Sequence, residues 1–463
     1  MNRGTILFPD SFPYVTSGNK VWSTLSKFAA PGEKANGEPK PQSVAGPSPK
    51  SEKATAVSGR SPYYGVFAAA ASKLSSFSAI AVMQALWASI VLLMAFRVFG
   101  IGGWQRPLIV GLLAAFSSLA FFTTVLMPDV FAGISVLSMA ILVFYGRSMS
   151  RAELAFWSLN LLVTTLFHMA FFVTTTGTMI VIFLLFRRRR DIMMLWPAAI
   201  LAAVLVGTLS IGYLASHLSE RRVSSIPFLL ARTVGDGTAE RVLSEDCPRI
   251  HYATCHFVPA FPIAEIDFLW NSSIVTPWAR MTNAERDAVS REQNAILVQV
   301  LRRYPVEQAV ASIGNTIRQL VKTDLTKFAR RDYVWPSIDR EFPGELATYR
   351  QTSIWAGQFP LAGLTWFWFT LYAASGVAAV MLFLGRKRLM PSLDPRKAAV
   401  VATLLTALLV SAATTGALAG VIGRYQARLS WVAVLALIVL VHHLYQMRRH
   451  TQPIAVGPSG ALA

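Results

Sequence analysis

The residues best suited to chemistry in this chain are carboxylates and arginines at the borders of long apolar stretches. Asp129 follows Met127 and Pro128 and is the only ionisable residue between the apolar runs 108–126 and 130–144. An ionisable residue between two membrane-spanning segments is a functional-site hypothesis by default, although Pro-Asp is also an ordinary turn pair. A carboxylate can deprotonate a hydroxyl as a general base, and arginine binds phosphate through a planar fork of donors.

The composition predicts that an integral membrane protein carries these residues. The chain has 463 residues, of which 54% are hydrophobic and 14% charged, and its mean hydropathy is +0.46. A soluble protein carries about 25% charged residues. The net charge of +19 comes from short basic clusters at the ends of apolar runs, which is the pattern of the positive-inside rule. We therefore expect the lipid bilayer as a partner, and not nucleic acid.

Apolar runs of the length that a membrane helix needs, about 17 to 25 residues, recur along the chain. We expect an all-α polytopic membrane protein with about nine transmembrane helices. Six lie within 75–215 and three within 361–446. The expected spans are 75–98, 107–127, 130–146, 152–169, 170–187, 193–215, 361–385, 398–420 and 429–446.

The basic clusters predict the orientation of these spans. The clusters fall at alternate connections, so all can be cytoplasmic together: Arg97 with Arg106, Arg147 with Arg151, Arg187 to Arg190, Arg386 to Arg388 with Arg396 and Lys397, and Arg448 with Arg449. The tail 447–463 is then cytoplasmic. The outer side receives the Asp129 turn, the segment 216–360 and the N-terminal residues 1–74. An outer N-terminus needs a way across the membrane, so we expect a further helix before Met1.

The N-terminal residues 1–74 are rich in Pro, Gly, Ser and Lys, above all between Pro31 and Arg60. This composition cannot bury enough surface to fold alone, so we expect a largely disordered outer loop. Stretches rich in aromatic residues and proline flank it at 7–14 and 60–67. They predict anchoring at the membrane interface.

The segment 216–360 is the only part large enough for a soluble domain, and we expect a mainly helical, periplasmic one. Asn283 is the expected N-cap of a helix that continues to Arg303. Pro305 opens a second helix. Its apolar residues form an amphipathic stripe at helical spacing: Val306, Val310, Ile313, Ile317, Val321 and Leu325.

The two cysteines of the chain, Cys247 and Cys255, lie in this outer segment. In an oxidising compartment we expect a disulfide between them. His251 and His256 are of the right type for a metal site, but structural zinc sites favour closer cysteine spacings. The disulfide is therefore the preferred interpretation.

The predicted topology gathers the candidate residues on the outer face. Such a set suits a transferase with a lipid-phosphate donor, because a carboxylate deprotonates the acceptor and arginines stabilise the leaving phosphate. The sequence has no Walker-type loop and no dinucleotide fingerprint. His168 is more typical of a hydrogen-bonded interfacial residue than of a ligand, and Asp267 of a surface turn. The full set is Asp10, Asp129, His168, Asp267, Arg424, Tyr425 and Arg428.

An ordered set of short motifs resembles the GT-C superfamily of integral membrane glycosyltransferases, which includes protein mannosyltransferases and aminoarabinose transferases. The motifs are Phe8-Pro9-Asp10-Ser11 followed by Tyr14, the stretch from Arg60 to Phe67, Met127-Pro128-Asp129 and Gly423-Arg424-Tyr425. Ser11 departs from the pattern, since many members carry a second acidic residue there. This departure leaves the involvement of a divalent metal open.

The resemblance implies a polyprenyl-phosphate-linked sugar as donor, inversion at the sugar carbon, and a glycan, lipid or protein as acceptor. By position, Asp10 becomes the general base and Asp129 the second acid. The candidates for binding the donor phosphate or the substrate are Arg424, Tyr425, Arg428, His168 and Asp267. No cofactor is obligatory, and the expected location is the bacterial inner membrane.

Two other functions fit the composition. A transporter often has internal repeats and broken helices at the bilayer midplane, whereas the ionisable residues here lie at the rims of the spans. A non-catalytic membrane scaffold, whose outer domain binds a partner, is the other. Transfer of sugar from a polyprenyl-phosphate donor distinguishes the glycosyltransferase from both.

Overall fold

A computed structural model describes residues 4–29, 57–58, 60–188, 192–218, 224–329 and 342–451 of the chain. Helices dominate these residues, and two short strands, β1 (Val57–Ser58) and β2 (Ser224–Ser225), pair in parallel. Seven segments of the described chain are helical, long and apolar enough to cross a membrane. The predicted class, an all-α multi-pass membrane protein, is confirmed at this level.

The seven segments correspond to seven of the expected spans. They are α3 (Phe77–Val98), Pro128–Ser148 with α6 (Phe131–Tyr145), α8 (Met169–Phe186), Leu195–Tyr213 in α9 (Leu195–Leu218), α17 (Leu361–Leu384), α19 (Pro395–Leu418), and Gly423–Arg448 with α20 (Gly423–Ala427) and most of α21 (Ser430–Thr451). The two other expected spans are shorter in the structure. Residues 152–169 contain α7 (Arg151–Leu166), which has 16 residues. Residues 107–127 divide into α4 (Gln105–Phe116) and α5 (Leu119–Thr124).

The break between α4 and α5 lies at two serines. Ser117 is extended, with φ −140° and ψ 175°, so α4 ends there. The Ser118 hydroxyl donates a hydrogen bond to the carbonyl of Ala427 at 2.7 Å, and its oxygen lies 2.8 Å from the Ser430 hydroxyl. Polar groups at a helix break inside a membrane need partners within the protein. Ala427 and Ser430 supply these partners for Ser118 and attach the break to α20.

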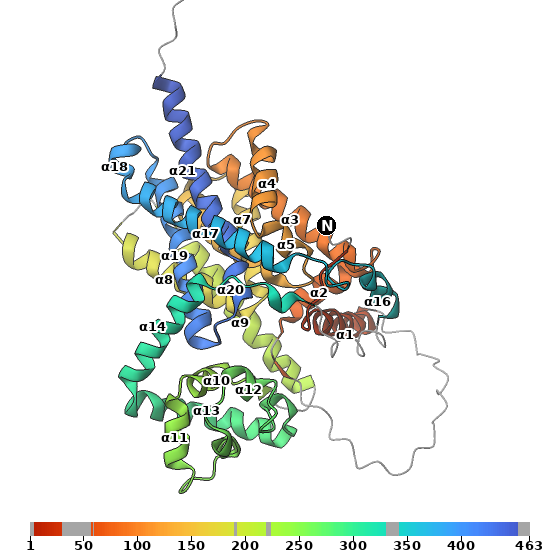
Figure 1. The fold of residues 1–463 in the computed structure, drawn as a ribbon. Coiled ribbons are helices and arrows are strands. Elements are labelled where there is room, and N and C mark those ends of the chain that lie inside the picture. The colour runs from red at the N-terminus through yellow and green to blue at the C-terminus, as the bar shows by residue number, and fades with distance from the viewer. Residues whose placement is uncertain are drawn as a thin grey trace, which may run out of the picture.

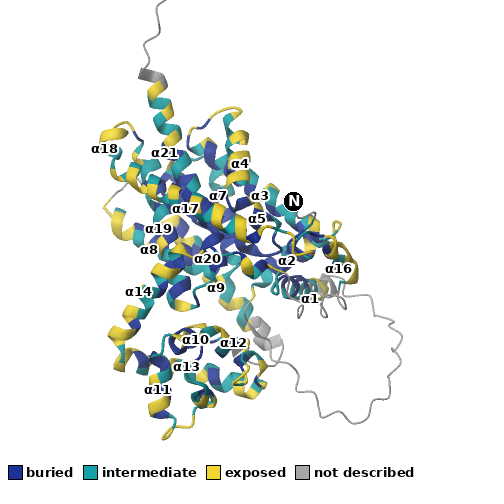
Figure 2. Ribbon diagram, viewed as in Figure 1, coloured by how far each residue is buried: buried dark blue, intermediate teal, exposed yellow. Residues whose placement is uncertain are grey.

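The central helix of the fold is α6. Of its apolar window, 94% is buried inside the protein, compared with 17% for α9 and for α17. A helix that is apolar on every side can be surrounded by other helices, and α3, α7, α8, α9 and α19 pack around α6. Gly133 lets the indole of Trp431 from α21 lie directly against it. Figure 2 shows buried residues at the centre of the bundle and exposed ones on α4 and α18 (Arg386–Leu389).

The N-terminal residues form two helices that pack side by side, α1 (Ser11–Ala29) and α2 (Pro62–Ser72). A Cβ atom on Gly18 would overlap the carbonyl of Gly65, so the two helices cross where neither has a side chain. Ser61 caps α2 by accepting a hydrogen bond from the amide of Tyr63 at 3.2 Å. This crossing brings the start of α1 close to the start of α2.

The prediction of a largely disordered loop over residues 1–74 is wrong for the two ends of that segment. Residues 4–29 and 60–74 are described, and both Tyr14 and Tyr64 are buried. Apolar and aromatic residues at these ends bury against the membrane helices, so the polar composition of the middle does not apply to them. Most of the stretch between Pro31 and Arg60 lies outside the described residues.

Residues 226–304 form a group of helices with a hydrophobic core of its own, at the bottom of Figure 1. We call this group the outer helical unit, after the side of the membrane that the sequence predicts for it. It contains α10 (Phe228–Gly235), α11 (Thr238–Asp246), η3 (Ala253–Ala260), α12 (Glu265–Leu269), η4 (Trp278–Arg280) and α13 (Asn283–Arg303). Cys247 and Cys255 form a disulfide with Cα atoms 5.7 Å apart, so this prediction is confirmed.

The N-cap of α13 is Thr282, one residue before the predicted Asn283. The Thr282 hydroxyl accepts from the amide of Glu285, and the Glu285 carboxylate accepts from the amide of Thr282 at 2.7 Å. This capping box fixes the first turn. Asn283 is the first residue of the helix, because only Thr282 has the glutamate three residues ahead that completes the box.

The described helices of residues 305–360 pack with the membrane helices. α14 (Pro305–Val321) packs along α19, as Figure 1 shows. The short η5 (Thr326–Phe328) and α16 (Pro343–Arg350) follow. Phe328, Leu346 and Tyr349 are buried in the core of the membrane helices and not in that of the outer helical unit. The predicted segment thus contains one compact unit, 226–304. Its later helices α14, η5 and α16 pack on the membrane helices instead.

Candidate functional site

Asp10 immediately precedes α1, and backbone pairing places it near Asp129. The amide of Leu126 donates to the carbonyl of Ile6 at 2.9 Å. The Ser11 hydroxyl donates to the carbonyl of Leu126 at 2.8 Å. Ser11 therefore connects the N-terminal segment to the residues just before Asp129.

Asp129 is buried and does not lie in an exposed turn, the alternative that the Pro-Asp pair left open. It lies in η1 (Pro128–Val130), which leads directly into α6, and only 1% of its side chain is exposed. The proline occupies the first turn, where its missing N–H needs no partner. The backbone pairing with Ile6 and the side chain of Arg428 cover a position that a simple hairpin would leave in water.

The helix α20 supplies two arginines to the same place. Arg424 and Arg428 are four residues apart and therefore lie on one face of a helical turn. Gly423 permits this position of α20, because a Cβ atom there would overlap the backbone of Asp324. The Gln319 side chain on α14 fixes Ile422, the residue before Gly423. It accepts a hydrogen bond from the amide of Ile422 at 2.8 Å and donates one to the carbonyl of Ile422 at 3.0 Å.

Five charged side chains from four separate segments form one continuous chain of ion pairs. Arg60 Nη2 lies 2.7 Å from Asp10 Oδ1, and Arg424 Nη1 lies 3.7 Å from Asp10 Oδ2. Arg424 Nε lies 4.0 Å from Asp129 Oδ2. Arg428 Nη1 donates to Asp129 Oδ1 at 3.0 Å. We call this set the Asp10–Asp129 cluster.

Exposure rises steadily along the Asp10–Asp129 cluster. The side chains of Asp129 and Arg428 are 1% exposed and that of Arg424 8%, whereas Asp10 is 33% and Arg60 40% exposed. Buried charges need partners of opposite sign because desolvation is costly, and the inner members have them. The open end of the cluster is the carboxylate of Asp10 with the guanidinium of Arg60.

Aromatic rings hold the two inner guanidinium groups in place. Arg424 lies 4.5 Å from the ring centre of Phe8, and Arg428 lies 5.0 Å from that of Phe171. Tyr425 contacts both guanidinium groups, at 5.5 Å and 5.0 Å. Cation–π contacts of this kind strengthen when water is excluded. Tyr425 thus orients the arginines and lies with them, as the sequence predicted for a shared site.

The arginines also set the ionisation of Asp10. Burial alone raises the pKa of this carboxyl, but Arg60 and Arg424 outweigh burial and hold its pKa below the ordinary value. Asp10 is therefore ionised at neutral pH and is able to accept a proton.

His168 caps α8, and its Nδ1 accepts a hydrogen bond from the amide of Ala170 at 3.1 Å. Its ring stacks on Phe171 at 5.1 Å. Burial, followed by the charge of Arg428, lowers the pKa of His168 to about 4. The imidazole is therefore neutral at pH 7. It packs on Phe171, whose ring contacts the guanidinium group of Arg428.

The structure brings together Asp10, Asp129, Arg424, Tyr425 and Arg428 but does not join Asp267 to them. Asp267 lies on α12 in the outer helical unit. Arg60 is a member of the cluster that the sequence had predicted as part of an interfacial anchor and of a GT-C-like stretch, but not as a site residue. Its partner Asp10 lies 50 positions earlier in the chain, so no local sequence pattern predicts this ion pair.

No group of three or more His, Cys, Asp or Glu side chains capable of holding a metal occurs among the described residues. Asp10 and Asp129 each face guanidinium groups. The donor set of the cluster, two carboxylates among three arginines, suits a phosphate-bearing ligand through the arginines.

The fold and the cluster define a helical multi-pass membrane protein with a chain of ion pairs between its N-terminal segment and its last helices. No family model matches the chain, and neither a curated protein nor a solved structure matches it.

Proposed function

We propose that the protein is a membrane glycosyltransferase that moves a sugar from a polyprenyl-phosphate donor to an acceptor in the cell envelope. The observation that supports this proposal most strongly is the Asp10–Asp129 cluster, in which one accessible carboxylate lies beside arginines. The four motifs that resemble the GT-C superfamily contribute all but one of its members. Arg428, four residues after Arg424, is the exception.

The proposed reaction follows from the order of the charges. Asp10 at the open end accepts the proton of the acceptor hydroxyl as its oxygen attacks the sugar carbon. The bond between that carbon and the phosphate oxygen breaks, and the electron pair leaves with the phosphate. Arg60 and Arg424 stabilise the charge that develops on the phosphate. Asp129 neutralises Arg428 and holds Arg424 in position from the buried side.

We also propose how the chain crosses the bacterial inner membrane. The seven long segments, together with α4–α5 and α7, make nine crossings, which keeps every basic cluster on the cytoplasmic side. The outer helical unit, the Asp10–Asp129 cluster and the disulfide then share the periplasmic side. An oxidising compartment is where such a disulfide persists.

The test is sugar transfer by the full chain in proteoliposomes, with polyprenyl phosphates that carry radiolabelled hexoses or pentoses. We expect transfer by wild type and by Asp287→Asn, which makes the same chemical change on α13. Asp10→Asn should reduce the rate by about 10²-fold or more, the usual contribution of a general base. Equal transfer by Asp10→Asn and Asp287→Asn would refute the role of Asp10. A wild-type chain that transfers none of these sugars would refute the proposed activity.

A further inference from the structure

A second concentration of charge lies where the outer helical unit meets the membrane helices. A cavity of about 630 Å³ opens between α10, α12, α14 and the connection before α20. Its lining includes Arg232, Arg318 and Lys322 as cations and Glu265 as the carboxylate, with Val321 and Val421. We call it the α14 pocket. It is separate from the Asp10–Asp129 cluster, although Val421 is only three residues before Arg424.

Arg232 of α10 is buried at the base of the α14 pocket, with 5% of the residue exposed. Its Nη2 lies 2.7 Å from Asp236 Oδ1 and its Nη1 lies 3.1 Å from Glu265 Oε1. The Nε hydrogen-bond donor has no partner among the described residues. The guanidinium group of Arg232 therefore places a fixed positive charge in the lining of the α14 pocket.

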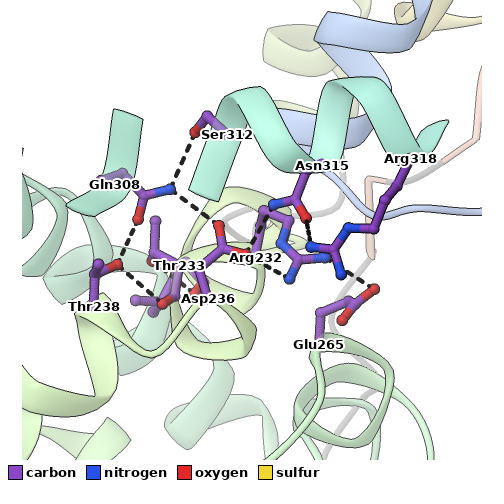
Figure 3. A network of polar contacts seen from close by, with 10 residues as sticks. Arg232, Thr233, Asp236, Thr238, Glu265, Gln308, Ser312, Asn315 and Arg318 are labelled. Carbon is purple, nitrogen blue, oxygen red and sulfur yellow. Dashed lines mark hydrogen bonds and ion pairs between the residues drawn. The ribbon is translucent and has the colours of Figure 1, made fainter. Parts of the chain in front are cut away.

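The carboxylate of Asp236 is occupied by structural hydrogen bonds from α14. Asn315 Nδ2 donates to its Oδ1 at 2.8 Å, and Gln308 Nε2 donates to its Oδ2 at 3.0 Å. Figure 3 shows how these amides lock α14 onto α10, with the side chains of Arg232 and Arg318 on the same side of Asn315. The network thus holds the pocket open between two fixed helices.

The remaining two cations of the α14 pocket lack a carboxylate partner among the described residues. Arg318 donates to the neutral Asn315 Oδ1 at 2.5 Å. Lys322 lines the pocket near the end of α14. Three cations face two carboxylates, Asp236 and Glu265, so the network carries one net positive charge. An anionic ligand would balance it.

The outward face of α14 is apolar, the reverse of a helix in a soluble protein. Gln308, Asn315 and Gln319 are buried, whereas the predicted stripe points away from the protein as far as Val321. Leu325, its last predicted residue, lies beyond the end of α14 and is buried in the core of the membrane helices. The exposed fractions along it are 69% for Val306, 64% for Val310, 61% for Ile313, 60% for Ile317 and 56% for Val321. Such a face is stable against acyl chains and unfavourable in water.

The stripe continues the lipid-facing surface of the membrane helices. α14 packs along α19, and the carbonyl of Leu320 accepts a hydrogen bond from the hydroxyl of Tyr372 in α17 at 3.1 Å. Val321 belongs to the stripe and to the lining of the α14 pocket. The cationic pocket therefore borders directly on the apolar face.

We propose that the α14 pocket binds the phosphate group of a membrane lipid whose acyl chains lie along the α14 stripe. Arg318 and Lys322 contact the phosphate from α14, and the buried guanidinium group of Arg232 adds its positive charge from α10. The site is independent of the Asp10–Asp129 cluster and does not rest on the proposed transferase activity. A lipid bound in the α14 pocket would lie close to the contact between Gln319 of α14 and Ile422, the residue before α20.

The experiment is a titration of the detergent-solubilised full chain with dioleoyl phosphatidic acid, followed by native mass spectrometry. Arg318→Gln/Lys322→Gln removes two exposed cations from the pocket. The matched control is Arg291→Gln/Arg302→Gln, which removes two exposed arginines from α13. We expect the pocket variant to weaken one lipid-binding event by about tenfold or more, the effect of losing one charge-assisted contact. The control should bind as wild type does.

Two further arms identify the source of the phosphate. Ile313→Ser/Ile317→Ser should weaken phosphatidic acid binding and leave the binding of inorganic pyrophosphate unchanged. Dioleoyl phosphatidylcholine, which has no net charge, should bind more weakly than phosphatidic acid. Equal lipid binding by the pocket variant and its control would overturn the site. Tight pyrophosphate binding with no effect of the stripe variant would overturn the lipid as its ligand.

Discussion

The Asp10–Asp129 cluster and the α14 pocket combine the same kinds of side chain in opposite arrangements. Each has three cations and two carboxylates. In the cluster the buried end is an ion pair, Asp129 with Arg428, and the open end exposes the carboxylate of Asp10. Beside the α14 pocket, the side-chain amides of Gln308 and Asn315 occupy the buried carboxylate of Asp236, and the open side of the pocket exposes cations.

This difference indicates that the group at the open end determines what each site can do. A carboxylate at the opening can accept a proton, with arginines beside it for the developing charge. Cations at the opening can hold an anion but cannot remove a proton from a substrate. The composition of the two sites is thus almost identical, and their expected roles are catalysis and binding.

The largest expected effect comes from removing the innermost cation of the cluster. Arg428→Gln leaves the buried carboxylate of Asp129 without its 3.0 Å partner. Breaking a buried pair costs about 3–5 kcal/mol, and we expect a large fall in the melting temperature of the purified chain. The matched change at the open side of the pocket, Arg318→Gln, should change the stability by only about 0.5 kcal/mol, as most exposed substitutions do. Equal losses would remove the contrast between a buried and an open end.

A smaller effect should follow from separating α1 and α2. Gly18→Ala places a methyl group against the backbone of Gly65, and overpacking of this kind costs about 1–3 kcal/mol. Because Asp10 precedes α1 and Arg60 precedes α2, sugar transfer should fall while phosphatidic acid binding at the pocket persists. Gly363→Ala is the control, since nothing lies within 4 Å of a Cβ atom there. Similar activity of both variants would show that the crossing does not position the cluster.

The smallest expected effect is a displacement of the pH profile. Arg60 and Arg424 hold the pKa of Asp10 below its ordinary value, which is about 3.9. The contribution of ionised Asp10 to stability is therefore present above about pH 3.9 and is lost as the pH falls through the lower folded pKa. Arg60→Gln should raise the pH at which the acidic limb of the transfer rate begins. An unchanged limb would mean that Asp10 does not control it.

The sequence singled out most members of the Asp10–Asp129 cluster because they lie at the ends of apolar runs. The positive-inside pattern placed Asp10, Asp129 and Arg424 on one side, and the structure brings them within ion-pair distance. It did not predict that Asp129 is buried, since the covering segment around Ile6 is 123 positions before Asp129 in the chain. Arg60 was missed for the same reason. Tertiary contacts of this range leave no periodic signal.

Two local features can be recognised from the sequence alone, the break between α4 and α5 and the apolar stripe of α14. The break at Ser117 and Ser118 is a pair of polar residues in an apolar run, and it divides the expected span 107–127. The stripe of α14 was predicted at the correct spacing, but its direction depends on which face finds partners. Buried amide hydrogen bonds from Gln308 and Asn315 to Asp236 turn the polar face inward. Periodicity alone describes a stripe without saying whether protein or lipid covers it.

The central claim is that the accessible carboxylate of the cluster acts on the acceptor, and single-turnover sugar transfer tests it most directly. Donor binding and the chemical step are measured separately on the full chain with Asp10→Asn, and with Asp287→Asn as control. We expect Asp10→Asn to bind the polyprenyl-phosphate sugar as the control does, but to transfer the sugar at a rate lower by about 10²-fold or more. A chemical step as fast as that of the control would contradict it.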